Sequence, residues 1–221
     1  MKLPHTQERN RGFTLVELMV VFAVIAIVVL LLLPAFTDRH QKPLVAVCMS
    51  HLKQIGLVNA LWNQDYTNGF PALVSTNNSG TMEYLLKGRV DLHFQALAPY
   101  LGSQPHILRC PADKRKWADD FTALSNSNIS YFVSLDSTPS NSASVAAGDR
   151  NLEIGGQAVN SGVATWAATN TVGWGSGLHS QVGRIIGNFL FSDGHVGRVS
   201  QDTLPKLTQQ LGTNANRLAF P

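Results

Sequence analysis

The chain has 221 residues, a formal net charge of +3 and two cysteines. This length allows one ordinary domain and an additional segment, and the positive charges are too dispersed to indicate a nucleic-acid-binding surface. The cysteines form no Cys-x-x-Cys pair and no sequence cluster with histidine, so the pattern does not indicate a structural zinc site.

The first predicted element is an apolar helix near the amino terminus. Residues 13–36 span 24 positions with a single charged side chain, that of Glu17. As a helix this run would be about 36 Å long at 1.5 Å per residue, which exceeds the ~30 Å hydrocarbon core of a bilayer. Lys2, Arg9 and Arg11 precede it. The positive-inside rule therefore places the amino terminus in the cytoplasm and the rest of the chain outside.

Two ordinary explanations of this run leave Glu17 unexplained. A secretory signal peptide has a shorter apolar core, of about 7–15 residues, and a small-x-small cleavage site, and the sequence does not show this pattern. A plain single-pass anchor accounts for the length and the orientation. It does not account for a carboxylate inside an apolar helix, which is costly and usually functional.

A cut between Gly12 and Phe13 would supply a partner for the acid. Phe13 would then carry a free α-amine, which is protonated near neutral pH, and Glu17 would lie about one helical turn away. Its carboxylate would suit the ammonium group of a neighbouring subunit, because charges in lipid must be paired or hydrated. Snorkelling of Glu17 to the lipid headgroups is the alternative, and the residues alone do not choose between the two.

The segment GFTLVE at residues 12–17, the apolar run after it and the proline at position 34 resemble the processing signal of type IV pilins and type II secretion pseudopilins. The resemblance implies that a prepilin peptidase cuts after Gly12 and methylates the new amine on Phe13. It also implies that Glu17 guides subunit assembly by meeting the amine of a neighbour. Pro34 is expected to kink or locally open the helix. The implied partners are the prepilin peptidase, other pilin or pseudopilin subunits and an inner-membrane assembly platform.

These features predict an α+β fold in four segments. A cytoplasmic leader occupies residues 1–12, a transmembrane and assembly helix residues 13–36, a periplasmic continuation of the helix residues 37–66, and a periplasmic globular head residues 67–221. The resemblance implies a long amino-terminal helix packed on a small, mainly antiparallel β-sheet. The expected protein is a structural subunit of the inner membrane with one span, no catalytic role and no cofactor.

A second helix is predicted from an apolar stripe. Apolar residues recur there at steps of three or four: Val45, Cys48, Leu52, Ile55, Val58 and Trp62. This helix is expected to end near residues 66–69 and to pack on the sheet. A further helix is expected around residues 94–101, with a break at Gly102.

Residues 122–148 are about half Ser, Thr, Asn or Gly. This composition favours loops and short edge strands over another core. The stretch is one of two linker candidates, and residues 37–42 are the other.

A hairpin is predicted where Asp193 and Gly194 separate two β-like runs. A two-residue turn of this kind requires positive φ at both central residues. Phe189 and Phe191 should share one face of the first strand, and Leu190 should lie on the other.

A second resemblance involves four segments further along the chain. CMSHLKQIGLVNALW, RCPAD, AGDRN and NFLFSDGHV are similar to a pilin-related family labelled by an H-X9-DG motif. The motif residues here are His179, Asp193, Gly194 and His195. Because 13 residues separate His179 from Asp193, the spacing is longer than the label requires.

Two rival functions use other features of the chain. His179, Asp193 and His195 are metal-ligand types and would serve a membrane-tethered periplasmic enzyme, although the turn already explains Asp193. Residues 122–148 would be the contact loops of a tethered ligand-binding module. No metal site is expected.

The two cysteines leave a further alternative open. Cys48 and Cys110 are compatible with one disulfide in an oxidising compartment and with two thiols elsewhere. A bridge closing this loop would contribute about 4 kcal/mol in the chain-entropy description. The bridge is the expected state.

Overall fold

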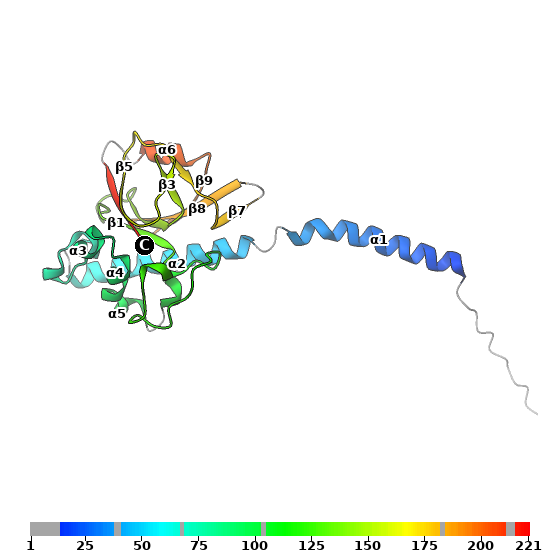
Figure 1. The fold of residues 1–221 in the computed structure, drawn as a ribbon, viewed down its shortest axis with the longest axis horizontal. Helices are drawn as coiled ribbons and strands as arrows, with labels where there is room; N and C mark the ends of the chain where they lie inside the picture. The colour runs from blue at the N-terminus through cyan, green and yellow to red at the C-terminus, as the bar shows by residue number, and fades with distance from the viewer. Residues whose placement is uncertain (1–13, 38–40, 67–68, 103–104, 182–183, 211–214) are drawn as a thin grey trace, which may run out of the picture. The chain divides into compact units, whose positions relative to one another are not determined.

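The structure is a computed structural model that describes residues 14–37, 41–66, 69–102, 105–181, 184–210 and 215–221 (Figure 1). It divides the chain into two compact units, Met1–His40 and Gln41–Pro221. The described part of the first unit is helix α1 (Leu15–Thr37) with Thr14 before it. The second unit, called the head below, contains every strand of the described residues.

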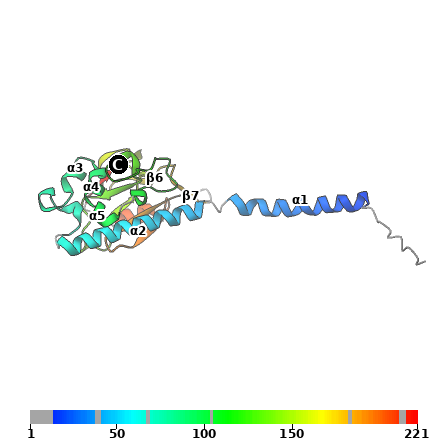
Figure 2. The same ribbon diagram turned by 90° about the horizontal axis from the view of Figure 1, so that it is seen from below.

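Helix α2 (Gln41–Tyr66) begins the head and lies across one face of its main sheet (Figure 2). The predicted apolar stripe is confirmed, because each of its residues is at most 4% exposed: Val45, Cys48, Leu52, Ile55, Val58 and Trp62. By length and composition, Leu44–Tyr66 is also apolar enough to cross a membrane. Since its apolar side is buried inside the head, α2 is a core helix.

The main sheet of the head has seven strands that pair antiparallel. The strands are β1 (Tyr131–Ser134), β2 (Val145–Asp149), β5 (Gly162–Trp166), β7 (His179–Gln181), β8 (Arg184–Phe191), β9 (Val196–Ser200) and β10 (Asn216–Phe220). Their order is β5–β10–β1–β2–β8–β7, and β9 also pairs with β8. A long helix on a mainly antiparallel sheet confirms the predicted α+β fold.

A smaller antiparallel sheet in the order β4–β3–β6 packs with α6 on the opposite face of the main sheet. These elements are β3 (Leu152–Ile154), β4 (Gln157–Ala158), β6 (Val172–Trp174) and α6 (Leu204–Gln210). Between α2 and β1 the chain forms short helices: η1 (Pro71–Leu73), η2 (Thr76–Asn78), α3 (Met82–Leu86), α4 (Val90–Ala96), α5 (Ala98–Leu101), η3 (Pro105–Leu108) and η4 (Asn126–Asn128).

Strand β8 shows that the main sheet is buried on both faces. Leu190 belongs to the core beneath α2, whereas Phe189 and Phe191 belong to the core shared with the smaller sheet. The Phe189 ring lies 4.9 Å from that of Trp174 between centroids. The predicted division of these residues between the two faces is confirmed, because neighbouring side chains on a strand point to opposite sides.

The prediction of loops and short strands at residues 122–148 is confirmed, but the strands are not at the edge of the sheet as predicted. This stretch contains β1 and most of β2, which lie in the middle of the main sheet and are buried along their length. A side chain in place of Gly148 would lie 2.7 Å from the rings of Phe132 and Phe189. The small residues that resemble loop composition are therefore required by close packing, and the stretch is not a linker.

The helix predicted around residues 94–101 is two helices, α4 and α5, which meet at Leu97. Pro99 lies in the first turn of α5, where its missing N–H and fixed φ favour the start of a new helix. The predicted break is confirmed, because Gly102 ends α5 with a φ of 74°.

The hairpin between β8 and β9 is confirmed, but its turn differs from the prediction. Gly194 has a positive φ of 81°, whereas Asp193 does not. The N–H of Gly194 donates to the carbonyl of Phe191 at 2.9 Å, and the carboxylate of Asp193 accepts from the N–H of His195 at 2.9 Å. A longer loop built on an ordinary turn with glycine at its end therefore replaces the two-residue turn.

Cys48 and Cys110 form a disulfide with a Cα–Cα distance of 5.2 Å. Cys48 lies on α2, and Cys110 follows η3. Both are fully buried in the core beneath α2. The bond ties the sheet-facing side of the helix to a segment that lies 62 residues further along the chain.

Replacing both cysteines by alanine is expected to lower the stability of the head by about 4 kcal/mol, because the unfolded chain regains the freedom of the closed loop. For a domain of this size that corresponds to a fall in melting temperature of roughly 8–16 °C. Tryptophan fluorescence of the full chain in detergent measures it, since all four tryptophans lie in the head. Reduction of the unmutated chain should give the same fall, and an unchanged melting temperature would contradict the account.

Candidate functional site in the amino-terminal helix

Helix α1 begins with reciprocal hydrogen bonds between Thr14 and Glu17. The backbone N–H and the hydroxyl of Thr14 each donate to Oε2 of Glu17 at 2.8 Å. The N–H of Glu17 in turn faces the Thr14 hydroxyl oxygen at 3.3 Å. This is a capping box, in which each side chain satisfies a backbone donor that the first helical turn leaves unpaired.

Thr14 is a site residue that the sequence reasoning missed. The signal was present, because Thr-x-x-Glu directly before an apolar run is the sequence signature of a capping box. The acid also lies in the first turn, where the positive end of the helix dipole favours a negative charge. Glu17 therefore has a structural role within its own chain, beside the two readings that the sequence suggested.

The capping box leaves part of the carboxylate free. Both bonds from Thr14 end on Oε2 of Glu17, and the hydrogen bonds between described residues leave Oε1 without a partner. A second donor can therefore bind Glu17 without breaking the cap. Gly12 and Phe13, between which the processing cut was predicted, lie outside the described residues.

The surface of α1 is apolar on all sides. Every residue of Leu15–Leu30 is exposed, and Leu15 reaches 74%. The helix continues through Pro34 to Thr37, giving 23 residues or about 34 Å, which is enough to cross a bilayer. A helix of this length that is apolar all round is suited to a cover of lipid or of other helices. The helix is therefore a single membrane anchor.

The structure does not bring together His179, Asp193 and His195, the three residues that the rival enzyme function would use. His179 is buried on β7 and pairs in register with Ile186, whereas Asp193 and His195 lie in the exposed turn after Phe191. About 16 Å of strand β8 separates Ile186 from Phe191. The second resemblance, which named these residues as a motif, stays a prediction.

The exposed pair in the turn has a local explanation. Nδ1 of His195 lies 2.6 Å from Oδ1 of Asp193, and the imidazole stacks on the Phe191 ring at 4.2 Å between centroids. Hydrogen bonds to His195 lower the pKa of the Asp193 carboxyl. These contacts hold the loop between the two strands, and they need no bound ion.

His179 has different neighbours, Cys110 and Asp149. Its Nε2 lies 3.3 Å from the sulfur of Cys110 and 3.7 Å from Oδ2 of Asp149. Burial raises the pKa of Asp149 to about 7, although hydrogen bonds from Asn188 act in the opposite direction. Burial lowers the pKa of His179 to about 4, and the charge of Arg198 adds to this effect. Between these two values both groups favour their neutral forms, so the contact is not an ion pair.

The fold also bears on residues 122–148, which were considered as the contact loops of a ligand-binding module. Residues 122–148 include two central strands, so the stretch cannot be removed as a loop without dividing the main sheet. Deleting residues 122–148 would remove β1 and most of β2 and so could not separate ligand binding from folding.

Comparison with known proteins identifies the amino-terminal segment. Residues 8–33 match a family described as the prokaryotic N-terminal methylation motif. The match includes Gly12, Phe13 and Glu17. No curated protein and no solved structure matches the chain. The chain therefore carries a prepilin-type processing signal on a single-pass membrane anchor.

Proposed function

We propose that the chain is a structural subunit of a type IV pilus or a type II secretion pseudopilus. The observation that carries this proposal is the combination of the methylation motif at residues 8–33 with an apolar helix long enough to cross a bilayer. In the membrane, lipid covers the apolar surface of this helix. In a filament, the helices of neighbouring subunits replace the lipid, so the subunit can leave the bilayer without exposing apolar side chains to water.

Processing supplies the charge that Glu17 requires. Cleavage after Gly12 gives Phe13 a terminal ammonium group, and the prepilin peptidase methylates it. In the filament this group binds Oε1 of Glu17 on an adjoining subunit, while Oε2 stays in the capping box with Thr14. The pairing offsets the cost of two charges among apolar helices.

The proposed orientation follows from charge and redox chemistry. The basic leader stays in the cytoplasm, and the head lies in the periplasm after insertion into the inner membrane. The Cys48–Cys110 disulfide supports this placement, because disulfides persist in oxidising compartments. An inner-membrane assembly platform and other pilin or pseudopilin subunits are the proposed partners.

Gly12→Ala is expected to block maturation, because the added methyl group occupies the position at the cut. Intact-mass analysis of the chain from envelopes of cells with an active prepilin peptidase should show that the leader is retained and that Phe13 is not methylated. Gln7→Ala, further from the cut, is the matched control and should be processed normally. A shortened, methylated Gly12→Ala product would contradict the predicted processing site.

Two substitutions separate the pairing role of Glu17 from its capping role. Glu17→Gln keeps an oxygen that accepts the bonds from Thr14 but removes the charge. Thr14→Val removes the hydroxyl and keeps the carboxylate. Glu17→Gln is expected to reduce the share of the chain in filaments by about tenfold or more, corresponding to at least ~1.4 kcal/mol per subunit contact. Thr14→Val should change it much less.

The share is measured as the amount of mature chain in the sheared or cross-linked filament fraction relative to the membrane fraction. Both variants should insert into the membrane and lose the leader at the normal position. If Thr14→Val reduces assembly as strongly as Glu17→Gln, the acid acts through the cap and the pairing account is wrong.

A further inference from the structure

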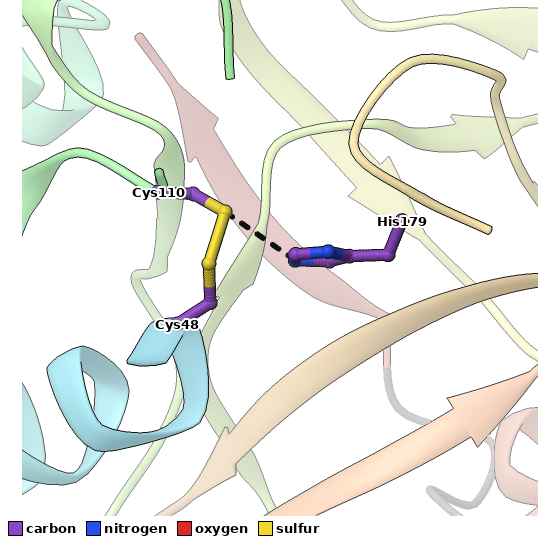
Figure 3. A group of neighbouring side chains, drawn as sticks. All are labelled: Cys48, Cys110 and His179. Carbon is purple, nitrogen blue, oxygen red and sulfur yellow. Dashed lines mark hydrogen bonds between the residues drawn. A yellow bond between two sulfur atoms is a disulfide. The ribbon is translucent and has the colours of Figure 1, made fainter. Parts of the chain in front are cut away.

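A buried group of three side chains comes from elements that are distant in the sequence (Figure 3). Cys48 lies on α2, Cys110 follows η3, and His179 begins β7. Their ligand atoms, the two sulfur atoms and one imidazole nitrogen, lie within 4.8 Å of one another. The sequence showed no such cluster, because the fold brings the residues together.

The histidine in this group is poorly satisfied as a hydrogen-bonding residue. His179 is 2% exposed, and its Nδ1 has no partner among the described residues. Its Nε2 is turned toward the sulfur of Cys110 at 3.3 Å (Figure 3), which is a weak partner. A buried polar ring without good partners is costly, so packing alone gives a poor account of a histidine at this position.

We propose that, when the Cys48–Cys110 bond is reduced, the two thiolates and Nε2 of His179 form a binding site for one zinc ion. Two thiolates and one imidazole are ligands that zinc takes. In a tetrahedral zinc site, sulfur and nitrogen ligands lie about 3.6 Å apart, close to the 3.3 Å between Nε2 and the Cys110 sulfur. The disulfide bond and the zinc site are then two alternative states of the same pair of cysteines.

The net charge of the metal with its two thiolate ligands favours zinc over copper. Zn²⁺ with two thiolates is neutral, whereas Cu⁺ with the same ligands would leave a net negative charge inside the core. Burying a net charge is expensive, and both cysteines are fully buried. Hard cations such as Ca²⁺ and Mg²⁺ prefer oxygen ligands. The site is therefore assigned to zinc.

A pocket lies beside this group. A pocket of about 360 Å³ is lined by Leu44, Pro111, Ala112, Lys114, Gly177, Leu178 and His179. His179 and the residues that follow Cys110 belong to its wall, although the imidazole itself is buried. Water from this pocket would supply the fourth zinc ligand, because the ligand atoms that lie within 4.8 Å of one another are the two sulfurs and one imidazole nitrogen, with no carboxylate oxygen among them.

The chemistry of the exchange balances with an external dithiol as reductant. The dithiol transfers two electrons and two protons to the disulfide, becoming a disulfide itself and leaving two protein thiols. Binding of Zn²⁺ then displaces both thiol protons to solvent and forms two zinc–sulfur bonds. After loss of zinc, exchange with an external disulfide, which takes up the two electrons and two protons and becomes a dithiol, restores the Cys48–Cys110 bond.

The test uses the full chain in detergent, reduced with a dithiol that is then removed without air. Zn²⁺ is titrated in competition with a chromophoric chelator, and Co²⁺ is titrated in parallel, because cobalt bound by thiolates gives a charge-transfer absorption. We expect one zinc ion per reduced chain, no site in the oxidised chain, and a higher melting temperature of the reduced chain when zinc is present.

His179→Gln should bind zinc at least about tenfold more weakly, the lower end of the loss seen when even an outer partner of a metal ligand is removed. His195→Gln, which changes an exposed histidine, is the matched control and should bind as the unmutated chain does. The oxidised forms of both variants, compared by tryptophan fluorescence, should be folded.

Four outcomes would overturn the proposal. These are failure of the reduced chain to bind zinc, equal binding by His179→Gln, equal binding by the oxidised chain, and a preference for Cu⁺ with no zinc bound. If reduction alone unfolds the head, zinc should restore its fluorescence spectrum, and failure to do so also counts against the site.

Discussion

Apolar surface must be covered, and the two long helices of this chain differ in what covers their apolar side chains. Both are apolar, and α2 even has the length and composition of a membrane span. Helix α2 places its apolar stripe against the main sheet, so its own head covers it. Helix α1 is apolar on all sides, and lipid or the helices of other subunits would cover it. The proposed function depends on this difference in the surroundings of the two helices.

The two oxygens of Glu17 allow it to cap its own helix and to pair with a neighbouring subunit at the same time. One oxygen caps the helix through Thr14, which fixes the backbone at the point where the mature chain would begin. The other oxygen is left to an outside donor. A capped first turn holds the carboxylate in one place. Glu17 therefore loses less side-chain entropy when a partner's ammonium group binds to it.

Local patterns predicted the structure well where short-range interactions decide it. The stripe on α2, the faces of Phe189 and Leu190, the hairpin at Gly194 and the break at Gly102 follow from periodicity and turn chemistry. The central position of β1 and β2 did not follow from local pattern, because Gly148 is selected by the rings of Phe132 and Phe189, which strand pairing places on either side of it. His179 was likewise assigned to the wrong group, since its neighbours are set by strand register and not by spacing along the chain. The Thr14 capping box also follows from a local pattern, Thr-x-x-Glu before an apolar run.

The position of the disulfide has a mechanical consequence for a subunit held by its first helix. A pull along α1 enters the head at Gln41, the first residue of α2, and Cys48 lies two turns further on. The covalent bond to Cys110 passes the load from the helix to the body of the head at that point. Peeling of α2 away from the sheet therefore stops after its first two turns unless the bridge is broken, and the hydrogen-bonded strands beyond it bear the remaining tension together.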